Sequence, residues 1–125
     1  MTSHYFSCVI KEPFSLVFEA LSRAFGTTYS KEFRKAEQSH IGIVLGEHYF
    51  FRANSDAAIL ILLSESSPDK TEIEVISCAG GTGITSVSYS AHSAYVQDVR
   101  KFLKNSGFQT ESEKEIPYFS NRLEG

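Results

Sequence analysis

Apolar residues recur at helical spacing in two stretches that lie far apart in the sequence. In the first stretch, Pro13 precedes a stripe of apolar residues with helical spacing, namely Phe14, Val17, Phe18, Leu21 and Phe25. Such a stripe forms the core-facing side of an amphipathic helix. Proline suits the first turn of a helix, and Gly26 suits a left-handed C-terminal cap. The sequence therefore predicts a helix over residues 13–25.

The second stretch predicts a helix from about Ala91 to Ser106. Its apolar stripe consists of Tyr95, Val96, Val99, Phe102 and Leu103. Ser90 or Ser93 is available as the N-cap. Gly107 follows the last turn, and Phe108 can fold back onto that turn as in a Schellman motif.

The other hydrophobic residues mostly alternate with polar ones, and a period of two is typical of β-strands. Strands are predicted over residues 4–10, 58–64 and 71–78. The strand at 58–64 is almost continuously apolar, as expected of a central strand. Short loops join consecutive strands, so we expect antiparallel neighbours.

Three stretches leave alternatives open. Residues 28–36 favour an exposed edge strand over a short helix, and Ile84–Tyr89 suits a further short strand. Residues 40–52 favour one long strand over a hairpin at Gly46-Glu47. In a single strand, five large apolar residues of one parity would share a face: Ile41, Ile43, Leu45, Tyr49 and Phe51.

The order of these elements indicates an α+β fold, written β-α-β(4–6)-α. Two amphipathic helices separated by a meander would cover one face of a curved antiparallel sheet. The expected division is a single domain over 1–108 and a C-terminal tail over 109–125. The tail is acidic and then apolar, and it suits a mobile end, a covering strand or a partner-binding segment.

The segment Ser77-Cys78-Ala79-Gly80-Gly81, taken with the element order, resembles a family of small uncharacterised bacterial proteins. Proteins of that family have a Gly-Gly turn between the last long strand and a C-terminal helix. The resemblance extends from about Tyr5 to Leu103. In topology alone, the order also resembles small helix-grip proteins related to the lipid-binding pollen-allergen fold. Neither resemblance implies catalytic residues or a cofactor, and the bacterial family has no agreed function.

Composition narrows the classes of function. The chain has 125 residues, of which 42% are hydrophobic, so it can fold without a metal or disulfide. Its net charge is −3 and its basic residues are scattered, which argues against nucleic-acid and anionic membrane partners. The longest apolar run, residues 57–63, is too short for a transmembrane helix. The N-terminal residues lack the pattern of a secretory signal, so we expect a cytoplasmic protein with Cys8 and Cys78 as free thiols.

A glycine cluster at Gly80, Gly81 and Gly83 is the most distinctive candidate site. A glycine-rich turn can hold phosphate when it leads into a helix. Here no Gly-Lys-Ser/Thr follows, and the spacing does not match the dinucleotide-binding pattern. A turn with close backbone packing is therefore favoured, with a ligand-contacting loop as the alternative.

Other candidate chemistry is sparse. Cys78 and His92 could form a nucleophilic pair, although their spacing matches no known signature. The conceivable metal ligands are His40, His48, Asp56 and His92, which lack the close spacing of zinc sites. Glu72 and Glu74 lie two residues apart and so share a strand face, which favours a solvated surface.

Three hypotheses follow. The first is a non-enzymatic binding or protein-interaction module without cofactor or metal, forming a homodimer through an exposed sheet edge. The second is a carrier of a small apolar ligand held between the sheet and the last helix. The third is an enzyme that uses Cys78 and His92. The residues expected to contact a ligand are Gly80, Gly81, Gly83, Cys78 and His92.

Overall fold

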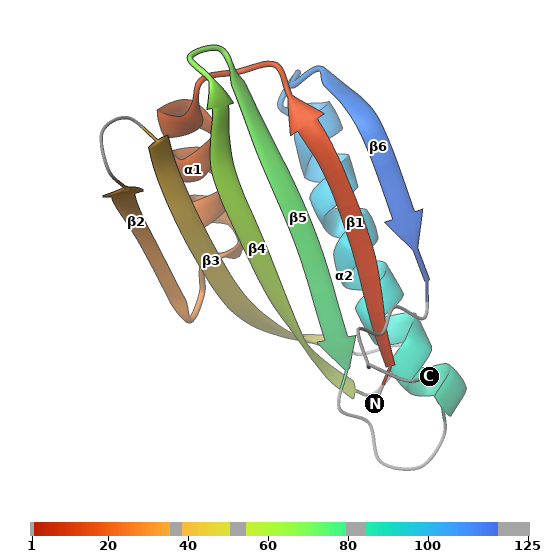
Figure 1. Ribbon diagram of the computed structural model, residues 1–125. Coiled ribbons are helices and arrows are strands. Elements are labelled where there is room, and N and C mark those ends of the chain that lie inside the picture. Colours follow the sequence, from red (N-terminus) through yellow and green to blue (C-terminus); the bar gives the residue numbers. More distant parts are fainter. Residues whose placement is uncertain (1, 36–38, 51–54, 80–84, 118–125) are drawn as a thin grey trace, which may run out of the picture.

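A sheet of six antiparallel strands forms one layer of the computed structural model, and two helices form the other (Figure 1). The structure describes residues 2–35, 39–50, 55–79 and 85–117. The elements are β1 (Thr2–Ile10), α1 (Phe14–Phe25), β2 (Tyr29–Lys35), β3 (Ser39–Phe50), β4 (Ser55–Ser67), β5 (Lys70–Ala79), α2 (Thr85–Asn105) and β6 (Thr110–Ile116). Their order in the sheet is β2-β3-β4-β5-β1-β6. The predicted α+β class is confirmed.

Several local predictions are also confirmed. Residues 28–36 contain the edge strand β2, and residues 40–52 contain the single long strand β3 instead of a hairpin. The C-terminus of α2 has both hydrogen bonds of a Schellman motif. The Phe108 amide donates to the Leu103 carbonyl, and the Gly107 amide donates to the Lys104 carbonyl, each at 3.1 Å. Gly107 has the positive φ of 81° that this motif requires.

The C-terminal cap of α1 differs from the prediction. Gly26 has φ of −84°, so the expected left-handed cap is wrong. Its amide still donates to the Ser22 carbonyl, at 2.9 Å. A Cβ at this position would lie 2.7 Å from that carbonyl oxygen, so glycine is needed here for close approach to the backbone.

The start of α2 also differs. Ile84–Tyr89 was expected to contain a short strand, but α2 begins at Thr85, before both predicted N-caps, Ser90 and Ser93. A stretch as short as the six residues Ile84–Tyr89 can match an alternating strand pattern by chance. Extending an existing helix from Ala91 back to Thr85 needs no new nucleation, so the longer helix prevails despite weak helix formers.

Part of the C-terminal tail joins the sheet. Of the three alternatives for residues 109–125, the covering strand is observed for Thr110–Ile116, which form β6. This strand pairs with β1 in antiparallel register, with Tyr5 opposite Ile116. An irregularity lies between Ser7 and Val9 of β1, and Ser112 on β6 has a positive φ of 56°.

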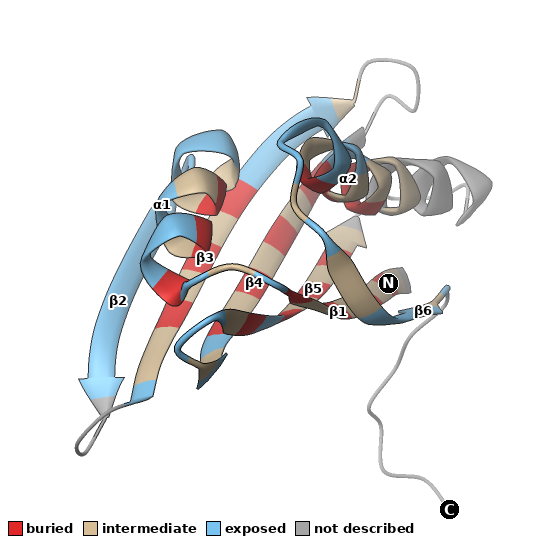
Figure 2. Cartoon of the chain, turned by 90° about the horizontal axis from the view of Figure 1, so that it is seen from above, coloured by how far each residue is buried: buried red, intermediate tan, exposed pale blue. Residues whose placement is uncertain are grey.

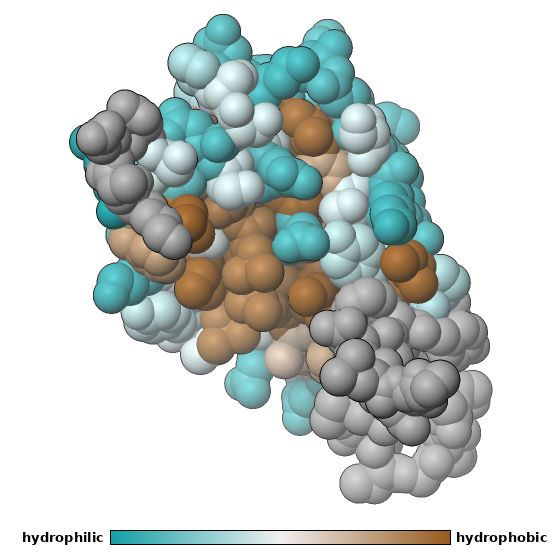
Figure 3. Space-filling model, in the orientation of Figure 1, coloured by the Kyte–Doolittle hydropathy of each residue, from teal (hydrophilic) through white to brown (hydrophobic). Residues whose placement is uncertain are grey.

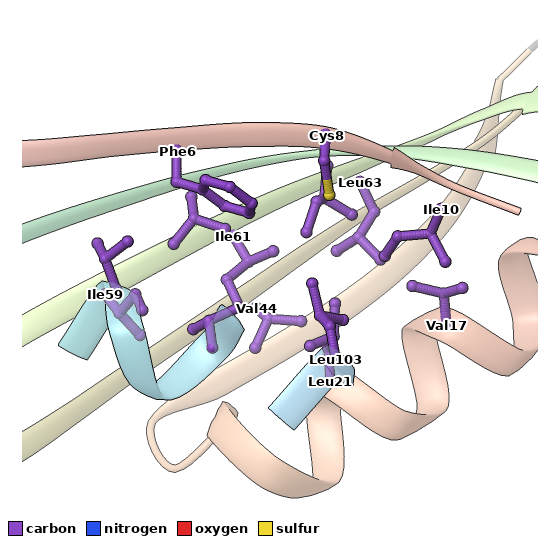
Figure 4. Close-up of a cluster of buried hydrophobic side chains, with 14 of the residues drawn as sticks. Phe6, Cys8, Ile10, Val17, Leu21, Val44, Ile59, Ile61, Leu63 and Leu103 are labelled. Atoms are coloured by element: carbon purple, nitrogen blue, oxygen red, sulfur yellow. The ribbon is translucent and has the colours of Figure 1, made fainter. Parts of the chain in front are cut away.

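The hydrophobic core lies between the two layers. Figure 2 shows both helices on the same side of the sheet. There, α1 packs over β3, β4 and β5, whereas α2 packs over β1, β4 and β5. Figure 4 shows part of this core, including Phe6, Cys8, Ile10, Val17, Leu21, Val44, Ile59, Ile61, Leu63 and Leu103. The even-numbered residues of β1 and the odd-numbered residues of β4 and β5 therefore face the helices.

Glycines determine which face of β3 packs against the helices. The helix-facing residues of β3 include Gly42, Val44 and Gly46, all buried. A Cβ on Gly46 would lie 2.0 Å from the carbonyl oxygen of Phe25 at the end of α1. Of the five residues predicted to share one face, Ile41, Ile43, Leu45 and Tyr49 do so, and that face points away from both helices. Phe51 lies outside the described residues.

We expect Gly46→Ala to destabilise the fold much more than Gly42→Ala. The first methyl group would meet fixed backbone, whereas the second would meet ring atoms of Phe18 and Phe14, which can shift. Expected losses in unfolding free energy are about 3 kcal/mol and about 1 kcal/mol respectively, measured by urea denaturation. Equal losses would contradict the proposed close contact between β3 and the end of α1.

Candidate functional site

The face of the sheet that carries no helix is apolar over its central strands. Figure 3 shows hydrophobic residues gathered over this part of the molecule. We call this surface the open face, and its apolar centre consists of Ile41, Ile43 and Leu45 on β3, Leu60 and Leu62 on β4, and Ile76 on β5. All six side chains are partly exposed. Two aromatic rings on β2 extend the centre, with Tyr29 50% and Phe33 39% exposed.

The strand register arranges the open face in rows that cross the sheet. The central row runs from β2 to β5 through Lys31, Ile43, Leu62 and Glu74. The row on one side contains Tyr29, Leu45, Leu60 and Ile76, and the row on the other contains Phe33, Ile41, Ser64 and Glu72. Directly opposed residues of antiparallel strands lie on one face with their Cβ atoms about 5 Å apart. Each row is therefore a continuous strip.

Charged side chains flank the apolar centre. Lys31 lies on β2 with its Nζ 6.0 Å from the centre of the Phe33 ring. Glu72 and Glu74 lie on β5, on one face of the strand as predicted. Tyr5 on β1 donates a hydrogen bond from Oη to Glu74 Oε2 at 2.8 Å. Burial raises the pKa of the Tyr5 hydroxyl, and the negative charge of Glu74 raises it further.

The predicted ligand-contacting residues are only partly described. Cys78 lies on β5 and is partly buried on the open face. Gly80, Gly81 and Gly83 lie outside the described residues, as does the side chain of His92 on α2. The glycine-loop and Cys78–His92 hypotheses therefore stay predictions. Burial raises the pKa of the Cys78 thiol, whereas nucleophilic cysteines have lowered pKa values.

Three of the four conceivable metal ligands have described side chains, namely His40, His48 and Asp56, and these three do not converge on one site. His40 Nδ1 lies 3.1 Å from Glu65 Oε1, and the ring stacks on Phe14. His48 lies opposite Ala57, which faces the helices, whereas Asp56 lies opposite Tyr49 on the open face. The two side chains therefore point to opposite faces of the sheet. Within the described part of the chain, no three His, Cys, Asp or Glu side chains lie close enough to hold a metal ion.

A pocket of about 450 Å³ lies where the C-terminal end of α2 approaches β6. Its walls combine apolar and charged groups: Phe6, Arg100, Lys101, Leu103, Lys104, Gly107, Phe108, Thr110 and Glu113. Arg100 lies over the Phe6 ring, 4.9 Å from its centre, and donates hydrogen bonds to Glu113 and Glu115. The pocket is therefore a charged groove at one end of the helix layer.

Two side chains, His4 and Arg100, contact the Glu115 carboxylate on β6. His4 Nε2 lies 2.6 Å from Glu115 Oε2, and Arg100 donates to the other carboxylate oxygen. Burial raises the pKa of the Glu115 carboxyl, but the hydrogen bonds and charges of His4 and Arg100 outweigh burial and leave the pKa below its ordinary value. This cluster joins β1, β6 and α2.

Fold and surface together define a class: a two-layer α+β sandwich with one sheet face uncovered by helices and apolar at its centre. Comparison with protein-family models, with curated proteins and with solved structures found no match. The resemblances stated from the sequence stay untested. Across the residues that the structure describes, no helix has the length and apolar character to cross a membrane.

The open face is the feature that reasoning from the sequence missed. The signal was present in β4, where residues 57–63 are apolar at odd and even positions alike. An antiparallel sheet with one solvated face normally alternates apolar and polar residues. A central strand that is apolar on both sides therefore indicated a second surface in need of cover.

Glu115→Gln is expected to lower the free energy of unfolding near pH 7 by about 1–2 kcal/mol, because the hydrogen bonds lose their charge. The lowered pKa shows that folding favours the ionised carboxyl. This stabilisation is therefore present above the ordinary pKa of 4.5 and is lost as pH falls through the folded-state pKa. Urea unfolding of both proteins near pH 7 and about pH 3 measures the effect.

The matched control is Glu19→Gln on α1, where Glu19 accepts a hydrogen bond from Arg23 at 3.0 Å and both side chains are largely exposed. Exposed pairs of this kind contribute little, so this variant should unfold like the wild type. A difference between wild type and Glu115→Gln that persists unchanged at low pH would contradict the assignment.

Native alkylation with iodoacetamide is expected to modify Cys78 at least about tenfold more slowly than the same thiol in unfolded protein, because its pKa is raised and it is partly buried. Cys8, which is buried and has its pKa raised to about 12, should remain unmodified until unfolding. Peptide mass spectrometry gives both rates. Rapid modification of Cys78 in the folded protein would instead support a nucleophilic cysteine.

Proposed function

We propose that this chain is a non-enzymatic protein-interaction module that binds its partner through the open face. The supporting observation is the strand β4, which is apolar on both sides although helices cover only one. Ala57, Ile59, Ile61 and Leu63 face the helices, whereas Ala58, Leu60 and Leu62 face away from them. A second layer of protein on the open face would bury the second set.

The composition of the surface supports a protein partner. The apolar centre has aromatic side chains at its margins, including Tyr29, Phe33 and Tyr49, which is 48% exposed. Protein interfaces are enriched in aromatic residues and are bounded by a polar rim. Contiguous exposed apolar patches of this kind mark interaction sites in soluble proteins.

Charge at the rim argues against an anionic lipid surface as the partner. Glu47 on β3, Asp56 on β4, and Glu72 and Glu74 on β5 lie on the same face as Lys31 and Lys35 on β2 and Lys114 on β6. Negatively charged surfaces attract clusters of Lys and Arg, whereas the charges on the described part of the open face are of mixed sign.

A second candidate function is the transport of a small ligand, which the pocket beside β6 favours. Its volume of about 450 Å³ lies within the range of small-molecule sites. Its walls include Arg100, Lys101 and Lys104, so a ligand there would need an anionic end beside an apolar body. The space directly between the sheet and α2 is filled by Tyr95, Val99 and Leu103, all buried.

A photoactivatable amino acid at position 62 is expected to give covalent protein adducts in an extract of the source cells, because the Leu62 side chain lies at the middle of the open face. Adducts are detected by their mass shift on denaturing gels and identified by peptide mass spectrometry. An adduct between two copies of this chain also counts as a protein adduct in this experiment.

The control places the same amino acid at Arg23 on α1, whose side chain is 80% exposed and lies on the opposite layer. We expect few or no adducts from this position. The same adducts in equal amount from both positions, or none from either, would refute the open face as the binding surface.

A further inference from the structure

We propose that the partner on the open face is a second copy of this chain, related by a twofold axis that runs along the strands between β3 and β4. This inference rests on the proposed function, because it names the partner of the same surface. Sheets that pack face to face keep their strands within about 30° of each other. A twofold axis in this position places β3 over β4 of the second copy, and β2 over β5.

Charge along the central row selects this arrangement. Over the four strands that would overlap, the row begins with Lys31, continues through Ile43 and Leu62, and reaches Glu74 on β5. Outside the overlap it continues through Ser7 on β1 to Lys114 on β6. Rotation about the proposed axis reverses the order of the strands and keeps each row in place. Lys31 of each copy then lies opposite Glu74 of the other, and Ile43 lies opposite Leu62. A twofold interface is self-complementary in this sense, since each contact occurs twice.

The surroundings of Lys31 and of Glu74 leave both side chains able to form an ion pair between the two copies. Lys31 is exposed, and its own strand offers the Phe33 ring as its nearest described partner, 6.0 Å from Nζ. The Glu74 carboxylate is oriented by the Tyr5 hydroxyl at 2.8 Å, and a carboxylate has further acceptor positions for a cation. Burial between two sheets would strengthen the attraction by lowering the local dielectric constant.

The other orientation of the twofold axis is disfavoured by the same charges. An axis perpendicular to the strands through the central row would place Lys31 against Lys31 and Glu74 against Glu74. Like charges opposed in an interface weaken association and so suppress the wrong arrangement.

The neighbouring rows are compatible with the proposed axis. In one of them, Leu45 would lie opposite Leu60, and Tyr29 opposite Ile76, so that apolar residues meet across the interface. In the other, Ile41 would lie opposite Ser64, and the Phe33 ring opposite Glu72. The contact is therefore most apolar over the central row and the row of Leu45.

The contact area predicts a weak dimer. Four overlapping strands about 4.8 Å apart, over a length of about 25–30 Å, give roughly 500–600 Å² per copy. The total of about 1,000–1,200 Å² lies at the lower end for specific interfaces. We therefore expect association to depend on concentration in the micromolar range.

Both sheet edges are less suited to self-association than the open face. The edge strand β2 carries Lys31, Glu32 and Arg34, and the edge strand β6 carries Glu111, Glu113, Lys114 and Glu115. Charged side chains and irregular backbone on edge strands oppose pairing with another chain. The positive φ of Ser112 adds such an irregularity to β6.

Sedimentation velocity over a concentration series tests the dimer, since the mass should rise from 13.9 kDa towards twice that value. Lys31→Glu and Glu74→Lys should each weaken dimerisation at least about tenfold by replacing two attractions with two repulsions. The double exchange, which combines Lys31→Glu with Glu74→Lys in one chain, should restore the wild-type dissociation constant to within about threefold. Leu62→Lys should abolish the dimer. Arg23→Glu, a charge reversal on the exposed side of α1, is the control and should leave association unchanged.

Circular dichroism melting shows whether each variant is folded, and the exposed position of Lys31 makes its variant the safest of the set. A double exchange that dimerises no better than either single variant would overturn the proposed register. A dimer that survives Leu62→Lys would be an edge dimer and would also overturn it.

A wild type that stays monomeric, while position 62 still cross-links another protein, would refute the dimer and leave the interaction module standing. Monomer without adducts would refute both.

Discussion

Close contact between β3 and the helix layer governs the rest of this structure. Gly46 lies against the backbone at the end of α1, where an added Cβ would come within 2.0 Å of a carbonyl oxygen. Gly42 lies against the rings of Phe14 and Phe18 in the same way. Because glycines occupy two of the positions of β3 that face the helices, the large side chains Ile41, Ile43 and Leu45 that alternate with them lie on the other side. The requirement for a close helix layer thus creates the apolar surface opposite it.

This constraint explains why the two faces of one sheet have different roles. The helix-facing side is a closed core, in which buried aliphatic and aromatic residues from both layers interdigitate. The open face has apolar residues of similar size but no second layer among the described residues. Burying a Leu or Ile side chain contributes about 1.5–3 kcal/mol, so an uncovered set of six favours association over exposure to water. The two helices cover one face of this sheet, and the open face is the surface on which we propose that a partner binds.

The spacing of apolar and polar residues predicted most helices and strands, because the features that specify each of them lie within a few residues in the sequence. The apolar stripe of α1, the Schellman motif at Gly107 and the uninterrupted strand β3 all follow from the spacing of neighbouring residues. The predictions for Gly26 and for the start of α2 were wrong. Tertiary packing decides the conformation of Gly26, and helix extension decides where α2 begins. The open face could not be assigned from alternation in β3 alone, since alternation reveals that two faces differ without revealing which one receives the helices. Only Gly42 and Gly46, considered as sites of close approach, carry that information.

The charges on the open face then favour one kind of partner surface over another. An apolar patch by itself accepts any apolar surface, and its affinity is non-directional. Lys31 on β2 and Glu74 on β5 lie in one row, three strands apart in the sheet, so the part of the row between them has a direction. A surface with an apolar centre and opposite charges at its two ends is complementary to a copy of itself rotated by half a turn. Such a surface excludes its other rotated arrangement by like-charge repulsion. In the proposed dimer, specificity therefore comes from these two charged residues, whereas the driving force comes from the apolar residues between them.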